Sequence, residues 1–226
     1  MIKLDNRLQE LYNMVRPNSK VVDVGTDHGY LITKLILDQK SISGKCVDIN
    51  IKCLKKAENL INQYNINNKI KLSLSDGLQD VLETEVDDII IAGMGSELII
   101  NILKNCNWLK KINNKHLILQ PMKKPWILRE YLFKNKFKII DEKVVFSKNF
   151  FYVIIKAKYT NQIINYTPIN IFTGTLLNNN NQVTKDYLNF LYKKFKCISQ
   201  KILANNSDIK KYQYFKTISD QIKKFI

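Results

Sequence analysis

The chain has 226 residues, of which 45% are hydrophobic and 25% are charged, and this composition excludes a disordered chain, a collagen-like repeat and a minimal disulfide-stapled fold. Its 36 lysines and arginines outnumber its 20 aspartates and glutamates, and the formal net charge of +16 favours a polyanion, such as a nucleic acid, as the partner. The alternative explanation is AT-rich coding, which enriches lysine, asparagine and isoleucine whatever the function.

The predicted elements up to residue 158 alternate between strands and helices. Apolar residues at steps of four, three and four predict a first helix over residues 3–16, which ends before Pro17. Five strand-like runs follow, at residues 21–25, 46–49, 69–74, 88–95 and 116–121. Helical patterns cover residues 30–37, 52–64, 96–109 and 126–134, and two last strand-like runs, with no helix between them, cover residues 138–146 and 150–158. This order predicts an α/β fold, a mostly parallel and doubly wound sheet with a terminal antiparallel hairpin.

The sequence changes character after residue 159, so we expect two domains, 1–159 and 160–226. Beyond an asparagine-rich stretch, apolar residues at steps of three and four predict a helical coiled-coil hairpin that turns at residues 205–207. Its seam residues are Leu188, Leu191, Phe195, Ile198 and Ile202, then Phe215, Ile218, Ile222 and Phe225. Residues 159–226 carry a net charge of +7, against +9 for the longer remainder. The charge favours RNA contact through Lys193, Lys194, Lys196 and Lys201 about as much as it favours a merely solvated hairpin.

Neither a metal site nor a membrane segment is expected. The four cysteines are scattered without a C-x-x-C pair, and the only histidines are His28 and His116. The N-terminus is amphipathic, and no apolar run in the chain approaches about 18 residues. We expect a reduced, soluble, cytoplasmic protein. The sequence leaves the oligomeric state open, and we favour a monomer.

The first strand runs into a turn, Gly25-Thr26-Asp27-His28-Gly29, that opens a helix at Tyr30. Glycine at both ends of the turn permits a sharp bend and the close approach of a ligand. Asp27 stands where a dinucleotide-binding G-x-G-x-x-G loop has its second glycine, and its charge would repel a pyrophosphate. The turn therefore predicts a site for a neutral or positively charged ligand, and the alternative is a plain tight turn.

Acidic residues and glycines also follow the next three strand-like runs. Asp48 lies 25 residues after Asp23, where a carboxylate can accept hydrogen bonds from both hydroxyls of a ribose, or otherwise cap the next helix. Asp76-Gly77 and Gly93-Met94-Gly95 end the third and fourth runs. Because the carboxyl ends of parallel strands meet at one edge of a sheet, these residues predict a nucleoside site there. A nucleoside held by carboxylates without a phosphate cradle points to S-adenosylmethionine rather than to NAD or ATP.

These motifs together resemble the bacterial tRNA (adenine-22-N1)-methyltransferase family. The resemblance is carried by Arg7, by the run D-x-G-x-D-H-x-Y-L from Asp23, by I-A-G-M-G from Ile91 and by L-I-L-Q-P from Leu117. It extends over residues 1–158 and, through the coiled-coil pattern, to the family's C-terminal domain. It implies a class I methyltransferase with a Rossmann-like sheet domain over residues 1–159, and a helical domain over residues 160–226 that contacts tRNA.

The family resemblance implies methyl transfer from S-adenosylmethionine to N1 of adenine 22 in tRNA. N1 is a neutral nucleophile and the product is cationic, so catalysis would rest on positioning and on a negative environment. Asp27 is the candidate catalytic residue, or else an anchor for the ammonium group of the cofactor. The candidate cofactor residues are Asp23, Gly25, Thr26, His28, Gly29, Tyr30, Asp48, Ile49, Asp76, Gly77, Gly93, Met94 and Gly95. The candidate substrate residues are Arg7, Gln120, Pro121, Lys123 and Lys124.

Several positions carry a second interpretation. Gln120 would hydrogen-bond an extruded adenine on which Met94 packs, or would be a strand-end amide satisfied by backbone, with Met94 in the core. Ser96 replaces a glycine of the family pattern, and we expect it to cap the following helix. Met122 stands where the family has asparagine, and Trp126 is expected in the core. For the whole chain, the alternatives are a methyltransferase acting on another RNA or on a protein, and a non-catalytic RNA-binding module.

Overall fold

A computed structural model describes residues 2–111, 114–205 and 208–226 of the chain. The chain forms two compact units, Met1–Ile164 and Asn165–Ile226, which divide a few residues after the boundary expected from the sequence. The turn expected at residues 205–207 falls mainly on Asn206 and Ser207, which lie outside the described residues.

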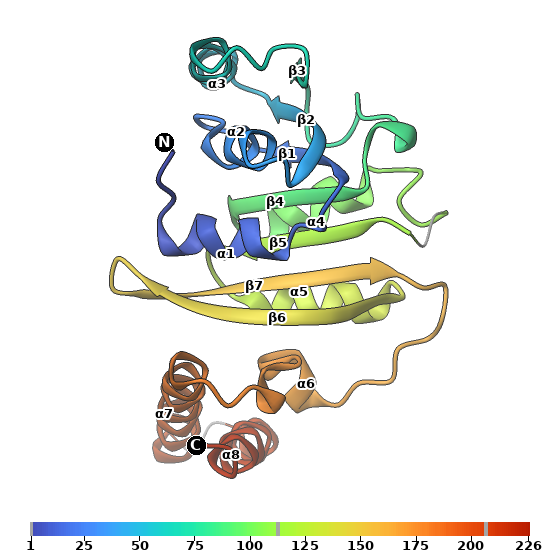
Figure 1. Ribbon diagram of the computed structural model, residues 1–226. Helices are drawn as coiled ribbons and strands as arrows, with labels where there is room; N and C mark the ends of the chain where they lie inside the picture. The colour runs from blue at the N-terminus through green and yellow to red at the C-terminus, as the bar shows by residue number, and fades with distance from the viewer. Residues whose placement is uncertain (1, 112–113, 206–207) are drawn as a thin grey trace. The chain divides into compact units, whose positions relative to one another are not determined.

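The first unit is built on a seven-stranded sheet with the strand order β3-β2-β1-β4-β5-β7-β6 (Figure 1). Its parallel strands are β1 (Ser19–Val24), β2 (Ser41–Asp48), β3 (Ile70–Leu74), β4 (Asp88–Met94) and β5 (His116–Pro121). The antiparallel hairpin of β6 (Phe137–Ser147) and β7 (Phe150–Tyr159) joins β5 through β7. The predicted doubly wound sheet with a terminal antiparallel hairpin is confirmed. The strand order reverses between β1 and β4, where open α/β sheets bind their ligands.

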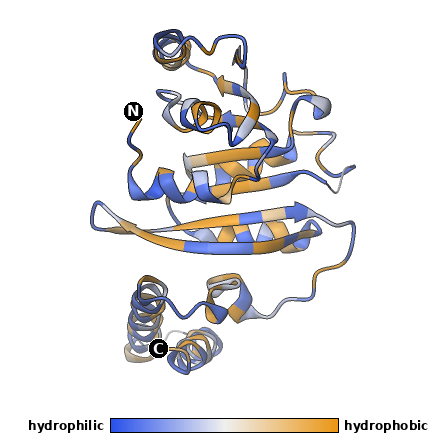
Figure 2. Ribbon diagram, in the orientation of Figure 1, coloured by the Kyte–Doolittle hydropathy of each residue, from blue (hydrophilic) through white to orange (hydrophobic). Residues whose placement is uncertain are grey.

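Helices cover both faces of this sheet (Figure 1). On one face, α1 (Asn6–Met14) and α2 (Tyr30–Leu37) pack on the central strands, and α3 (Ile51–Gln63) packs with α2 on β2 and β3. On the other face lie α4 (Ser96–Lys104) and α5 (Pro125–Lys134), and the short 3-10 helix Glu83–Glu85 precedes β4. Long hydrophobic stretches run along β4 and β7, as expected for strands buried on both faces (Figure 2).

Two helices are shorter than the apolar pattern predicts. The first helix begins at Asn6 because the side chain of Asp5 accepts a hydrogen bond from the backbone N–H of Leu8 and caps it. The helix expected over residues 96–109 ends at Lys104. Leu109 is buried all the same, from a turn that is held where the indole of Trp108 donates to the carbonyl of Val81. The predicted helix was too long because the apolar spacing continues after Lys104, into a segment that is buried but not helical.

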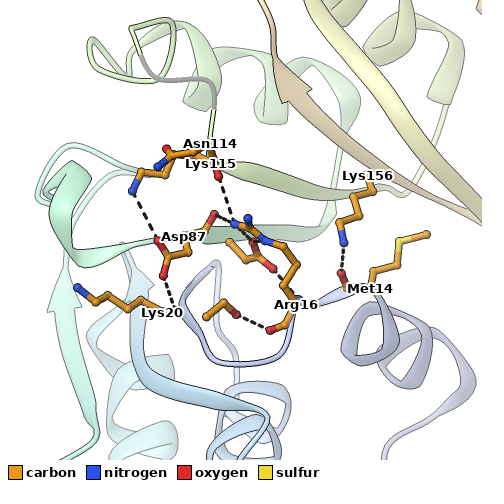
Figure 3. Close-up of polar contacts among 9 residues, drawn as sticks. Met14, Arg16, Lys20, Asp87, Asn114, Lys115 and Lys156 are labelled. Atoms are coloured by element: carbon orange, nitrogen blue, oxygen red, sulfur yellow. Dashed lines mark hydrogen bonds and ion pairs between the residues drawn. The ribbon is translucent and has the colours of Figure 1, made fainter.

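A polar network fixes the end of α1 to the start of the central strands (Figure 3). The buried carboxylate of Asp88 accepts hydrogen bonds from the backbone N–H of Arg16 at 2.8 Å and from its Nε at 2.6 Å. Arg16 also donates to the carbonyl of Asp87. The ammonium groups of Lys40 and Lys156 donate to carbonyls in the last turn of α1, where helix geometry leaves acceptors unpaired. Burial lowers the pKa of both lysines.

The terminal hairpin has its own anchors. Its two-residue turn, Lys148-Asn149, has positive φ at both positions, as a type I′ turn requires. The buried pair Arg129 and Glu142, whose Nε and Oε1 are 2.7 Å apart, ties α5 to β6. Trp126, expected in the core, is only half-buried at the start of α5. The hairpin is therefore held next to β5 by its pairing through β7 and by the contact of β6 with α5.

The second unit is helical. It comprises α6 (Pro168–Thr173), the 3-10 helix Leu176–Asn178, α7 (Gln182–Ala204) and α8 (Ile209–Lys223). The predicted helical hairpin is confirmed, and Phe195 of α7 stacks on Phe215 of α8 with 5.8 Å between ring centroids. The seam is shorter than predicted, because Phe225 lies beyond the end of α8 and is exposed. The helix α6 was not predicted, and its Phe172 packs edge-on against Phe195.

Candidate functional site

Two cavities lie at the carboxyl ends of the parallel strands, on either side of Gly25. The larger, of about 290 Å³, is bounded by α1, by the turn between β1 and α2, and by Gly93 at the end of β4. The smaller, of about 80 Å³, is bounded by the ends of β2, β3 and β4 and by α4. Both therefore lie at the point where the strand order reverses.

The turn after β1 is shaped by its two glycines. The backbone N–H of Gly25 donates to the carbonyl of Val47 at 2.8 Å, which ties the turn to the end of β2. Gly25 has φ +80°, and a Cβ there would overlap Cε of Met94. Gly29 has φ +68°, and a Cβ there would lie 3.0 Å from Cβ of Ala57 in α3. Both positions therefore combine a left-handed backbone with a close neighbour, which explains why glycine is required.

Asp23 is the less exposed of the two acids that line the larger cavity. Its carboxylate accepts a 2.6 Å hydrogen bond from Oγ1 of the buried Thr26. Burial raises the pKa of Asp23 to about 6, against the lowering effects of the Thr26 hydrogen bond and of the Arg7 charge. The neighbouring charge of Asp48 raises it slightly further. A partly desolvated carboxylate in a cavity is stabilised when a cationic ligand binds beside it.

Asp27 occupies a different environment in the same cavity. Its side chain is 64% exposed, and its carboxylate pairs with Lys56 at 3.0 Å and with His28 at 3.3 Å. The hydrogen bond from Lys56 holds the pKa of Asp27 below its ordinary value. His28 in turn stacks on Tyr30, with 5.2 Å between ring centroids. Asp27 is thus a charged residue whose charge α3 already balances.

The smaller cavity brings together the residues expected to hold a nucleoside. It is lined by Asp48 and Ile49 after β2, by Asp76 and Gly77 after β3, and by Met94. Asp48 accepts a hydrogen bond from the backbone N–H of Asn50 through Oδ1, and its side chain is half-buried. Since Met94 lies over Gly25, its side chain stands between the two cavities.

The side chains of Arg7 and Gln120 form a hydrogen-bonded pair that was not predicted from the sequence. Gln120 is fully buried, and its Oε1 accepts hydrogen bonds from Nη1 of Arg7 at 2.8 Å and from the backbone N–H of Gly93 at 3.1 Å. Its Nε2 donates to the carbonyl of Pro121. The amide of Gln120 is therefore used inside the protein, and Arg7 lines the larger cavity rather than the outer surface.

Ser96 does not cap α4 as expected. Gly95 occupies the cap position, and Ser96 is the first helical residue, buried to 2% exposure. Its hydroxyl lies 2.9 Å from the carbonyl oxygen of Lys123 and 3.0 Å from that of Lys124. The expectation was wrong because the loop after β5 offers the hydroxyl two backbone carbonyl acceptors. Ser96 therefore holds the loop that presents the exposed Lys123 and Lys124.

The structure gathers most of the expected cofactor residues. The exception is Gly95, which lines neither of the two cavities. Four of the five candidate substrate residues also line neither cavity: Gln120, Pro121, Lys123 and Lys124. Sequence reasoning missed the apolar lining, because such residues cannot be told from core by type alone. The missed apolar residues are Leu8, Leu31 and Ala92 in the larger cavity and Val24, Leu98 and Ile102 in the smaller, and the polar Ser75 of the smaller cavity was missed as well.

The donor set fits S-adenosylmethionine. A half-buried carboxylate stands at the end of β2, where a ribose is recognised, and the partly desolvated carboxylate of Asp23 faces the larger cavity. Within the described residues, no group of three or more His, Cys, Asp and Glu side chains is arranged to hold a metal ion. No helix in the described ranges is long and apolar enough to cross a membrane.

Comparison with known proteins gives consistent results. Residues 4–155 match the family described as methyltransferase domain. The tRNA (adenine(22)-N(1))-methyltransferase of Bacillus subtilis is 29% identical over 176 residues, which cover 78% of this chain and 74% of that protein. The crystal structure of the B. subtilis M1A22 tRNA methyltransferase TrmK superposes with a TM-score of 0.82 at 25% identity, covering 99% of this chain and 97% of that one. The structure of M. capricolum TrmK in complex with S-adenosyl-homocysteine superposes with a TM-score of 0.80 at 25% identity, covering 98% and 97%.

Proposed function

We propose a function for this chain from the premise that it belongs to the methyltransferase domain family, and within it to the bacterial tRNA (adenine(22)-N(1))-methyltransferases. It transfers a methyl group from S-adenosylmethionine to N1 of adenine 22 in tRNA. The observation that carries this proposal is the pair of cavities around Gly25. Each cavity is lined by two carboxylates, and the turn at Gly25 lacks the second glycine of a phosphate-binding loop.

The cofactor residues divide between the two cavities. Asp48 accepts hydrogen bonds from the ribose hydroxyls, and the adenine lies against Ile49, Asp76 and Gly77. Of the two carboxylates in the larger cavity, Asp23 binds the ammonium group, because Asp27 is already paired with Lys56. When bound, S-adenosylmethionine supplies the electrophilic methyl group.

The protein contributes positioning and charge rather than a general base. N1 of adenine already carries a lone pair, so no proton has to be removed before attack. The Asp23 carboxylate, with Asp27 at the rim, provides the negative environment that favours a cationic product. Arg7, held by Gln120, lies in the same cavity as these acids and orients the extruded adenine.

The tRNA is held by basic residues beyond the reaction site. Lys123 and Lys124 are exposed on the loop after β5, and the lysines of α7 and α8 supply further phosphate contacts. Residues 160–226 thus form the tRNA-contacting domain in this proposal. We place the protein in the cytoplasm and expect a monomer, which light scattering after gel filtration tests directly.

A direct assay tests the proposed reaction. The protein is incubated with S-adenosylmethionine and unmodified tRNA, the RNA is digested to nucleosides, and N1-methyladenosine is sought by mass spectrometry. The expected product appears with native tRNA and disappears when adenine 22 is replaced by guanine. Cofactor binding without any methylated nucleoside would point to another acceptor, and absence of cofactor binding would leave an RNA-binding module.

Replacing Gly25 with alanine should weaken S-adenosylmethionine binding by about tenfold or more and destabilise the fold by about 1 kcal/mol or more. The added Cβ would overlap the side chain of Met94, and the alanine would have to adopt the left-handed backbone conformation of Gly25. Isothermal titration calorimetry and thermal unfolding measure the two effects. Gly95→Ala is the matched control, because Gly95 has φ −68° and a Cβ there would meet no atom of the other described residues within 4 Å. Equal effects of the two substitutions would contradict this account.

Gln120 and Arg7 should behave as one unit in kinetics. Gln120→Leu removes the acceptor that holds Arg7, and Arg7→Ala removes the guanidinium itself, so each should lower kcat/KM by roughly 10- to 100-fold. The double variant should be little worse than either single variant, because both lose the same positioned group. A double-mutant cycle on kcat/KM provides the measurement. Effects that multiply would instead mean that Gln120 contacts the adenine independently of Arg7.

A further inference from the structure

A third cavity lies entirely within the C-terminal unit, outside the methyl-transfer site. It has a volume of about 360 Å³ and is open to solvent between the start of α6, at Thr167 and Pro168, and one side of α8. The α8 residues that line it recur at steps of three and four, so they form a single face of the helix. These residues are Lys210, Gln213, Tyr214, Thr217, Ile218 and Gln221.

Most of the lining area is apolar, and its polar groups suit a planar ligand that has hydrogen-bonding edges and a negative charge. Two glutamine amides supply donors and acceptors in matched pairs, and Thr217 adds a hydroxyl. Tyr214 presents an aromatic ring that is 40% exposed, and its edge contacts with Phe172 and Phe215 fix the ring in place. Among the described residues of the lining, Lys210 is the only charged one, and none of them carries a carboxylate. Amide edges, an aromatic ring and one cation are the groups that bind a nucleotide's base and phosphate.

The composition of the whole C-terminal unit also suits RNA. Residues 159–226 have ten lysines against three aspartates. On both helices of the hairpin, lysines lie over aromatic rings: Lys194 over Phe190, Lys196 over Tyr192 and Lys216 over Tyr212. Interleaved cations and rings are the usual surface of proteins that bind single-stranded nucleic acid. A cavity of this size lies within the range of small-ligand sites.

We propose that this cavity holds one unpaired nucleotide of the tRNA, stacked on Tyr214 and read by Gln213 and Gln221, with Lys210 at the phosphate. The inference rests on the proposed function, since it assumes tRNA as the substrate. It adds a base-contacting site to a domain otherwise expected to make only phosphate contacts. The same chemistry would also fit a free mononucleotide, so the test has to separate the two sources.

The test uses the full-length protein and measures the dissociation constant for unmodified tRNA over a series of salt concentrations. Tyr214→Ala and the double variant Gln213→Ala/Gln221→Ala should each weaken binding about tenfold at every salt concentration, because stacking and base contacts release no counterions. Lys210→Ala should reduce the salt slope by about one phosphate contact. Gln200→Ala, which replaces a glutamine outside this cavity, is the matched control and should have little effect.

Three readouts decide the result. Circular dichroism verifies that each variant is folded, and the glutamine double variant keeps the test valid if loss of Tyr214 disturbs its contacts with Phe172 and Phe215. Affinities of the cavity variants within twofold of wild type, in a protein that methylates tRNA, would overturn the inference alone. If the cavity variants lose affinity for AMP but keep their affinity for tRNA, the cavity binds a free nucleotide, and this result would also overturn the inference. A wild-type protein that neither binds nor methylates tRNA would remove the proposed function first.

Discussion

Replacing Asp23 with asparagine should weaken the binding of S-adenosylmethionine by about 30-fold or more while making the free protein more stable. Asparagine keeps the shape of the side chain and can still accept the hydrogen bond from Thr26, but it removes the charge. Binding suffers because the cofactor's ammonium group loses its counter-ion. Calorimetry measures the loss of affinity, and thermal unfolding without cofactor measures the gain in stability.

The gain in stability follows from the raised pKa of Asp23, which is about 6 in the folded protein. The folded state holds the proton more tightly than the unfolded chain, whose pKa is near the ordinary value of 3.8. Stability is therefore highest below about pH 4 as far as this group is concerned, and it falls as the pH rises through about 6. Asparagine mimics the protonated form, so at pH 7 the substitution should stabilise the free protein by about 1 to 3 kcal/mol.

The same pKa sets the pH dependence of cofactor binding in the wild-type protein. The protonated carboxyl cannot pair with the ammonium group, so the dissociation constant should rise about tenfold between pH 7 and pH 5. The Asp23→Asn variant should bind weakly at both pH values and lack this dependence. An unchanged wild-type affinity at pH 5 would show that Asp23 is not the ammonium ligand.

Asp27→Asn is the matched control, because it removes a carboxylate from the same turn. Asp27 is mostly exposed and is already paired with Lys56 and His28, so its loss should cost less than about fivefold in affinity. A large loss of kcat at Asp27 with little change in cofactor affinity would restore it as the catalytic residue. A large loss of cofactor affinity would exchange the roles assigned to the two acids.

The edge of the sheet that binds the cofactor could be found from the sequence, because strand ends are marked locally. Asp23, Asp48 and the pair Asp76-Gly77 each follow an apolar run, and the parallel topology brings them together without further information. Gly25 and Gly29 are also local signals, since their positive φ values belong to a single turn. For these residues, chain position and residue type were sufficient.

The pair formed by Arg7 and Gln120 could not be found in this way. Their hydrogen bond joins residues 113 positions apart, and it depends on how α1 lies on the sheet. A lysine-rich sequence makes any arginine look like a phosphate contact, whereas here the guanidinium is turned into the cavity. The role of Ser96 was misjudged for the same reason, because its acceptors at Lys123 and Lys124 come from another loop. Tertiary contacts overrode local preference in both cases.

Replacing Asp88 with asparagine should have the largest effect on stability, about 3 kcal/mol of the free energy of unfolding. Asp88 is fully buried, and its two oxygens accept from the backbone and the guanidinium of Arg16. Without the negative charge, Arg16 is left partly buried beside Lys40 and Lys156, whose lowered pKa values already reflect burial in the same region. The loss of stability comes from leaving the charge of Arg16 without a partner, and this cost is larger than the net contribution of the Arg16–Asp88 pair to stability.

Urea unfolding followed by tryptophan fluorescence isolates this effect, because both tryptophans, Trp108 and Trp126, belong to the first unit. Glu130→Gln is the matched control: it breaks an exposed pair with Lys134 and should change the free energy of unfolding by less than about 1 kcal/mol. A similar small change for Asp88→Asn would mean that Arg16 is solvated rather than held by Asp88. Cofactor affinity of the folded variant should stay within a few-fold of wild type, because Gln120 still holds Arg7 at the other end of α1. The network of Figure 3 thus supports the helix that carries Arg7 without taking part in the site itself.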